Sequence, residues 1–196
     1  IPDEYLDEAI ETTKEIATRC HARIDVDSLK EPQFETPQGY LSNKEFILKL
    51  LKDGLTEKIN SNQVNIDDVD IYLDRINTEL SLIADKGYVD YFLLTRDFCS
   101  WAYEEKILQS PGRGSAAGSL ICWLLGITRV NPIKYDLFFE RFMNPERIKE
   151  PDIDNDFQDS ERQKVKDYVA ERWGAPNIAS CAAYSRYTAN TLFREV

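Results

Sequence analysis

The stretch PGRGSAAGSLICWLLGI, residues 111–127, constrains the fold most, because it places several small residues and an arginine directly before a long apolar run. Glycine lets the backbone approach a ligand closely, and the first amides of a helix have no intrahelical acceptors. With Arg113 beside it, this pattern favours an anion, by default a phosphate, at the start of a helix. The alternative is a tight turn that only packs the helix closely.

Two known phosphate motifs fit this stretch unequally. A Walker A loop is excluded, because the lysine before the final hydroxyl residue is absent. The permissive dinucleotide pattern GxGxxA is satisfied through Gly112, Gly114 and Ala117, and Asp136 lies about twenty positions further on, where such proteins carry an acid. A dinucleotide-binding oxidoreductase therefore stays open on this motif alone.

A second stretch, PDIDNDF at residues 151–157, alternates acidic residues with others. If it is extended, Asp152, Asp154 and Asp156 share one face, because strand side chains have a period of two. Like charges on one face repel, and a divalent cation removes the conflict. The alternatives are a solvated acidic edge or a calcium loop, although Phe157 and Gln163 stand where an EF-hand needs glycine and glutamate.

Helical spacing of apolar residues covers much of the chain. It predicts helices over residues 3–20, 42–59, 71–84 and 90–106, with a short strand near 106–110 and a further helix after the acidic stretch. Ser42 or Asn43 is the expected N-cap of the second helix, and Ser160 with Gln163 forms an S-x-x-Q capping pattern. Gly87 and Gly174 are expected helix stops. The fold class predicted is α+β.

Composition excludes several classes of protein. A net charge of −11 and a pI near 4.7 argue against a general nucleic-acid coat protein. Four scattered cysteines and the single His21 have no zinc-ligand spacing, so free structural thiols in a reducing compartment are expected. No apolar stretch is long enough to span a membrane. The first residue is not methionine and the last helical pattern is uncapped, which predicts a fragment of a longer protein.

Three segments occur in a fixed order: SPGRGSAAGSL, YDLFFERFMNPER and PDIDNDF. Together they resemble the C-family of bacterial replicative DNA polymerases, the alpha subunits of DNA polymerase III. The segments TELSLIADKGYVDYFLLTRDF upstream and YVAERWGAPNIASCAAYSRYTANTLFREV downstream extend the resemblance over most of the chain.

The resemblance implies a nucleotidyltransferase-like palm, related to that of the X-family polymerases, with a helix-rich N-terminal segment. Residues 1–38 then correspond to the end of the polymerase and histidinol phosphatase domain with its linker, residues 39–183 to the first part of the palm, and residues 184–196 to the start of the thumb. The implied function is template-directed DNA synthesis, with dNTP and primer–template DNA as substrates and other replisome subunits as partners. A bacterial cytoplasm, or a host cytoplasm for a phage enzyme, is the implied location.

The resemblance also implies roles for individual residues. Asp152 and Asp154 match the metal-binding catalytic aspartates, with two Mg²⁺ ions as cofactors, which Mn²⁺ can replace, whereas Asp156 matches a position of less certain role. The other residues that match functional positions of the family are implied to bind the triphosphate, and they are Arg113, Gly114, Ser115, Arg141 and Arg147. For Arg141 and Arg147, surface pairs with Glu140 and Glu146 are the alternative. The third carboxylate of the family matches no residue here, so the isolated fragment is expected to be inactive.

Several residues depart from the family pattern and suggest a divergent branch, such as a phage enzyme. AAYSRYTA replaces the usual threonine, phenylalanine, glycine, threonine run after the palm helix, and Arg129 and Asn131 stand where acids are common. A non-catalytic scaffold module of a replication complex is the alternative from another class of function.

Overall fold

The computed structural model describes residues 3–22, 33–146 and 151–180. Contacts divide the chain into two units, residues 1–32 and 33–196. The first unit contains helix α1 (Asp3–Arg19), which confirms the helix predicted over residues 3–20. The domain boundaries expected at residues 38 and 183 stay predictions.

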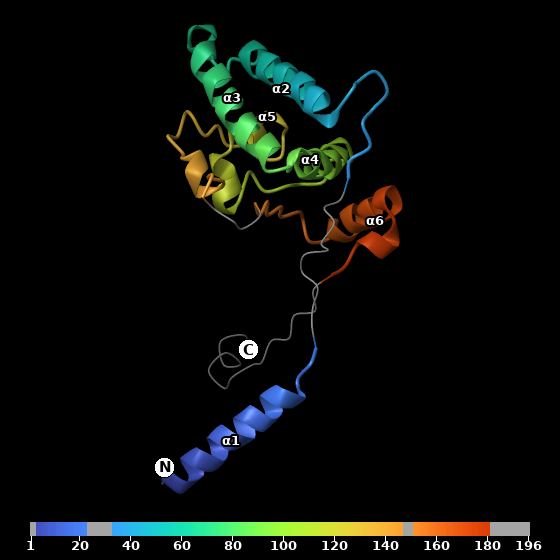
Figure 1. Cartoon of the computed structure of the whole chain (residues 1–196). Helices are drawn as coiled ribbons and strands as arrows, with labels where there is room; N and C mark the ends of the chain where they lie inside the picture. Colours follow the sequence, from blue (N-terminus) through green and yellow to red (C-terminus); the bar gives the residue numbers. More distant parts are fainter. Residues whose placement is uncertain (1–2, 23–32, 147–150, 181–196) are drawn as a thin grey trace, which may run out of the picture. The chain divides into compact units, whose positions relative to one another are not determined.

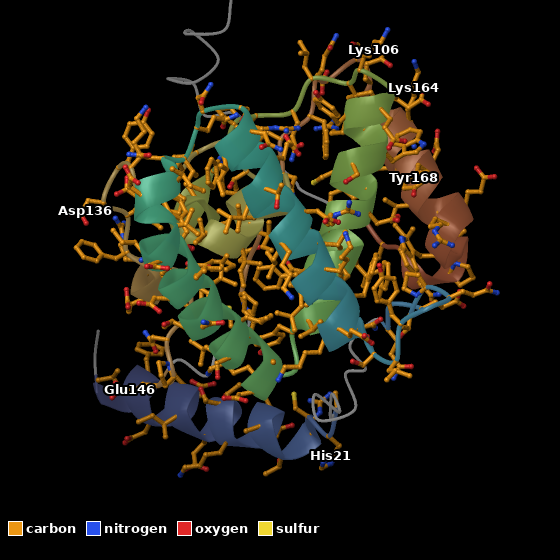
Figure 2. The ribbon with its side chains drawn as sticks, turned by 90° about the horizontal axis from the view of Figure 1, so that it is seen from above. His21, Lys106, Asp136, Glu146, Lys164 and Tyr168 are labelled. Carbon is orange, nitrogen blue, oxygen red and sulfur yellow. The ribbon has the colours of Figure 1, made fainter. Side chains whose placement is uncertain are left out.

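The second unit is built from helices (Figure 1). These are α2 (Asn43–Asn60), α3 (Val69–Asp85), α4 (Val89–Glu104), α5 (Leu120–Leu124) and α6 (Arg162–Trp173), with short 3-10 helices η1 (Ile66–Asp68), η2 (Gly114–Gly118), η3 (Phe139–Arg141) and η4 (Ala175–Asn177). Helix α5 packs against α2 and α3, while α4 packs against α2 and α6. Figures 1 and 2 both show α6 beside α4.

Helix α5 lies at the centre of the core. All five of its residues are buried, between helices that present their apolar faces to it. The contact with α2 is close at Gly54, where a Cβ atom would lie 2.4 Å from the carbonyl oxygen of Leu124. Since any side chain at that position would collide with backbone, glycine is what lets α2 approach α5.

Two of the expected helix ends are confirmed. Ser42 is the N-cap of α2, and its hydroxyl accepts a hydrogen bond from the amide of Glu45. The carboxylate of Glu45 in turn accepts from the amide of Leu41 at 2.7 Å. After α3, Gly87 adopts a φ of +82°, the left-handed conformation that favours glycine at a helix end.

The capping box predicted at the start of α6 was wrong. Helix α6 begins at Arg162 with no side-chain cap, so Ser160 and Gln163 do not form a capping box. Their side chains are bonded elsewhere: the Ser160 hydroxyl accepts from Gln158, and the Gln163 amide donates to Asp167. At the other end of α6, Gly174 is the C-cap with a φ of +89°, as expected.

The α+β prediction holds only in its helical part. Among the described residues, β pairing is limited to one isolated antiparallel bridge, between Gln109 and Phe157. Both predicted strand segments take part in this bridge, but neither extends into a ladder, so a nucleotidyltransferase sheet is not seen. The remaining described residues of the unit gain their backbone hydrogen bonds mostly within helices and turns.

Cys99 and Cys122 are buried free thiols, which confirms Cys122 as a core residue, while Cys20 is an exposed free thiol. Cys181 lies outside the described residues. Among the helices that the structure describes, none has the length and apolar character needed to cross a bilayer.

Candidate functional site

The glycine-rich turn and the acidic stretch are held side by side by backbone hydrogen bonds. The amide of Ser110 donates to the carbonyl of Asp156, and the amide of Gln158 donates to the carbonyl of Leu108, each at 2.9 Å. These two bonds flank the Gln109–Phe157 bridge. They bring together two segments that lie more than forty residues apart in the sequence.

The acidic stretch exposes alternate residues. Asp152, Asp154 and Asp156 are exposed, whereas Ile153 is buried and Asn155 is half-buried between them. The three carboxylates therefore face solvent from one side of an extended segment, as the period-two pattern predicted.

Two of these acids meet the glycine-rich turn directly. A Cβ atom built on Gly114 would lie 3.3 Å from Oδ2 of Asp154, so the backbone of the turn faces that carboxylate. Gly114 has a φ of +60°. Nη1 of Arg113 lies 3.1 Å from Oδ1 of Asp156, and both side chains are more than half exposed. An exposed pair of this kind contributes little stability and exchanges readily for another partner.

The other predicted triphosphate ligands are placed as follows. Ser115 is half-buried within η2, and Arg141 is exposed in η3. The 3-10 helices η2 and η3 contact each other, and a Cβ atom on Gly118 would lie 2.7 Å from the carbonyl oxygen of Phe138. Arg141 therefore lies on an element, η3, that contacts the glycine-rich turn. Arg147 lies outside the described residues.

The helix start predicted at the glycine-rich turn is different in the structure. Residues 114–118 form 3-10 helix η2, and α5 begins only at Leu120 and ends after five residues, with Ser119 as its N-cap. The first two amides of α5, from Leu120 and Ile121, donate to the carboxylate of Glu79 at 2.9 and 3.1 Å. An anion does occupy the helix start, but it is a side chain of the protein itself.

Sequence reasoning missed Glu79, which is completely buried. Its carboxylate also accepts from the Ser119 hydroxyl at 2.8 Å and from Nε of Arg75 at 2.7 Å. Burial raises the pKa of Glu79, and the four donors oppose that shift. The signal was present: Glu79 lies on the face of α3 that also carries Ile76, Leu80 and Ile83, all buried.

Arg75 extends this cluster to the loop before η3. Its Nη2 donates to the carbonyl of Gly118 at 3.0 Å and to the carbonyl of Leu137 at 3.2 Å. One guanidinium therefore joins α3 to the end of the glycine-rich turn and to the segment that leads to Arg141. Charge-assisted bonds of this kind are stronger than neutral ones, so the cluster fixes the turn against the core.

Tyr91 of α4 supports the acidic stretch from beneath. Its hydroxyl accepts a hydrogen bond from the amide of Ile153 at 3.2 Å. Burial raises the pKa of Tyr91, and the charges of Asp152 and Asp154 raise it further, although the Ile153 amide opposes the shift. The phenol therefore lies close to both proposed metal ligands.

The exposed carboxylates of the acidic stretch offer an open site for a divalent cation. Among the described residues, no group of three or more acids, histidines or cysteines converges on one point, so the structure shows a pair of open aspartates and no closed cage. No described cation forms an ion pair with Asp152 or Asp154. Hard oxygen ligands that are exposed and not neutralised suit Mg²⁺, which keeps several of its waters.

The dinucleotide interpretation loses its structural context. That fingerprint needs a strand before the turn and a helix after it, but here the described turn follows a single bridge residue and precedes a five-residue helix.

The acidic segment and the glycine-rich turn both lie within the part of the chain that matches a known family. Residues 45–196 match the family described as the bacterial DNA polymerase III alpha NTPase domain, and the chain belongs to that family. It is 39% identical over 189 residues to the DNA polymerase III subunit alpha of Halalkalibacterium halodurans, covering 96% of this chain and 16% of that protein. It is also 39% identical over 181 residues to the subunit alpha proteins of Staphylococcus aureus strains MRSA252 and COL, covering 92% of this chain and 16% of each.

Proposed function

We propose that this chain carries the triphosphate- and metal-binding part of a template-directed DNA polymerase. The reaction is transfer of a nucleotidyl group from dNTP to the primer 3'-hydroxyl. The observation that carries the proposal is the approach of Gly114 to Asp154, which places a glycine turn against an open carboxylate. Membership of the polymerase family supports the choice of reaction.

Asp152 and Asp154 are the proposed ligands of two Mg²⁺ ions. When bound, such ions lower the pKa of the attacking hydroxyl and stabilise the charge that develops as pyrophosphate leaves. The protein's contribution is to hold the two carboxylates outward on one segment, with Ile153 buried between them and its amide bonded to Tyr91. Asp156 is a weaker candidate ligand, because Arg113 already engages it.

The triphosphate is proposed to lie against the glycine-rich turn. Gly114 leaves room for phosphate oxygens, Ser115 supplies a hydroxyl, and Arg113 supplies positive charge after exchanging Asp156 for phosphate. Arg141 and Arg147 are proposed to add positive charge from the neighbouring segment. The amides at the start of α5 are left out of this proposal, because Glu79 engages them.

The chain spans about a sixth of the length of the relatives it matches. Polymerase activity, primer–template DNA as substrate and replisome partners are therefore proposed for the intact protein. The nucleotidyltransferase-like palm over residues 39–183 is part of the same proposal. The 196-residue chain alone is expected to bind metal and nucleotide without extending a primer.

Primer extension by the intact polymerase tests this function. We expect Asp154→Asn to lower kcat at least about 100-fold, because a proposed ligand of the charge-stabilising ions would be lost. Asp159→Asn is the matched control, since Asp159 is a highly exposed acid two residues beyond the acidic stretch and pairs only with Arg162 at 3.3 Å among the described residues. Equal extension by both variants would contradict the proposal and favour a scaffold role.

A further inference from the structure

A closed network of polar side chains lies beneath the acidic stretch. Nε2 of Gln109 donates to Oδ1 of Asn155 at 2.9 Å, to the carbonyl of Ile127 at 3.0 Å and to Sγ of Cys99 at 3.2 Å. The Cys99 thiol donates in turn to Oδ1 of Asn155 at 3.5 Å. Gln109, Cys99 and Asn155 thus form a triangle that joins three separate segments of the chain.

The orientation of both amides follows from their neighbours. If the Gln109 amide were reversed, its oxygen would face the carbonyl of Ile127 and Oδ1 of Asn155, which are both acceptors. If the Asn155 amide were reversed, its oxygen would face the carbonyl of Ile153, to which Nδ2 now donates at 3.3 Å. Each amide therefore holds the other in one orientation.

The Asn155 side chain spans Asp154. Its bond to the carbonyl of Ile153 links the residues on either side of that aspartate, while the Ile153 amide is held by Tyr91 and the Asp156 carbonyl by Ser110. The backbone on both sides of Asp154 is consequently fixed by hydrogen bonds with Asn155, Tyr91 and Ser110, and Gln109 holds the Asn155 side chain that makes the first of them.

The network is a poor device for stability alone. Oε1 of Gln109 is buried without a hydrogen-bond partner among the described residues, and such an atom is costly. Apolar side chains of similar size would fill the same space without an unpaired oxygen of their own, although the Ile127 carbonyl would lose its donor. Apolar side chains would not supply the hydrogen bond from Asn155 to the Ile153 carbonyl, which links the residues on either side of Asp154.

We propose that Gln109 is a positioning residue for the polymerase reaction, acting through Asn155 to fix the backbone around Asp154 beneath the glycine-rich turn. This inference rests on the proposed role of Asp154 as a metal ligand. It is separate from the roles of the aspartates themselves, because neither Gln109 nor Asn155 faces the solvent side of the segment.

The test measures Tb³⁺ binding to the 196-residue chain. Tb³⁺ occupies oxygen-ligand sites, and Tyr91, beside Asp152 and Asp154, can sensitise its luminescence. Four proteins are compared: wild type, Gln109→Met, Asn155→Leu and the double variant. Gln158→Met is the matched control, because Gln158 directly follows the bridge residue Phe157, and its exposed side chain bonds only Ser160 among the described residues. Thermal melting of each protein gives its Tm.

We expect each single variant to bind Tb³⁺ about 10-fold more weakly than wild type, as is usual when partners of metal ligands are removed. The singles lose roughly 5 °C in Tm because polar atoms are left without partners. The double variant regains part of that Tm, since its two apolar side chains pack against each other while the carbonyls of Ile127 and Ile153 stay without these donors, yet it keeps the weak Tb³⁺ affinity. The control matches wild type in both measurements.

Two results would overturn the inference. If Tb³⁺ affinity follows Tm across the four proteins, or stays constant in all of them, the network has only a structural role. A separate arm tests the function on which the inference rests: if Asp154→Asn binds Tb³⁺ as wild type does, the metal assignment fails, and the positioning role fails with it. Loss of Tb³⁺ binding in Asp154→Asn with unchanged binding in Gln109→Met removes the inference alone.

Discussion

Oδ2 of Asp154 would lie 3.3 Å from a Cβ atom on Gly114. A carboxylate this close to the backbone of a glycine turn leaves space for a ligand only while the turn has no side chain. The two residues belong to segments predicted separately from the sequence, and their approach joins the acidic stretch to the glycine motif.

Substitution of Gly114 tests the need for that space. Gly114→Ala should weaken triphosphate and metal binding about 10-fold, since the new methyl group would press on Asp154 and the φ of +60° would be strained. Isothermal titration with a non-hydrolysable dNTP and Mg²⁺ measures the affinity. Gly39→Ala is the control, because Gly39 also has positive φ but nothing within 4 Å. Equal affinities in the two variants would contradict the need for space at Gly114.

The buried Glu79 should be a large contributor to the free energy of unfolding. Glu79→Gln removes the charge that Arg75 and the α5 amides engage, and breaking a buried pair costs about 3 kcal/mol or more. Urea unfolding followed by tryptophan fluorescence gives the change. Glu57→Gln, at an exposed glutamate 3.6 Å from Lys58, should change stability by less than about 0.5 kcal/mol. A similarly small change in the free energy of unfolding of Glu79→Gln would contradict the stabilising role of the Glu79–Arg75 cluster.

The Tyr168 hydroxyl should ionise at a higher pH than that of an ordinary tyrosine. Burial chiefly raises its pKa to about 12, and its hydrogen bond to Asp97 at 2.7 Å adds to the shift. The ordinary value is about 10, so the stabilisation from Tyr168 is complete below pH 10 and is lost as the pH rises through about 12. Absorbance at the phenolate band, compared with Tyr168→Phe, isolates this group. A Tyr168 that ionises near pH 10 in the folded protein would refute the prediction.

The buried thiols should resist alkylation. Burial raises the pKa of Cys99 to about 12 and also raises that of Cys122, whereas Cys20 is exposed. Because the thiolate is the reactive form, iodoacetamide at pH 8 should label Cys20 and leave Cys99 and Cys122 intact until urea unfolds the chain. Mass spectrometry of tryptic peptides distinguishes these cysteines. Labelling of Cys99 at the rate of Cys20 would mean that the second unit opens readily.

The sequence predicted well what depends on local pattern. Apolar spacing located the long helices, and Ser42 is the N-cap of α2, as predicted. The period-two alternation correctly placed Asp152, Asp154 and Asp156 on the exposed side of their segment. These features are decided within a few residues of the chain. The resemblance to the polymerase family was confirmed by the family match.

What the sequence did not predict depends on tertiary contacts. The helix start that seemed free for phosphate is engaged by Glu79, which lies forty residues earlier. The Gln109–Asn155 pair was equally hidden, because nothing local indicates that two half-buried amides will meet. Sheet content was overestimated for the same reason: extended pattern alone does not fix how far two segments pair.

The alternation along residues 152–157 has a practical consequence for anyone who engineers this protein. Outward residues such as Asp152 contact solvent, while inward residues such as Ile153 contact the core, so the two sets can be altered independently. Changes to the outward set are expected to tune ligand chemistry at little cost in folding yield, whereas changes to the inward set alter yield first. A library that randomises the two sets separately would therefore distinguish catalytic sequence requirements from folding requirements within six consecutive codons.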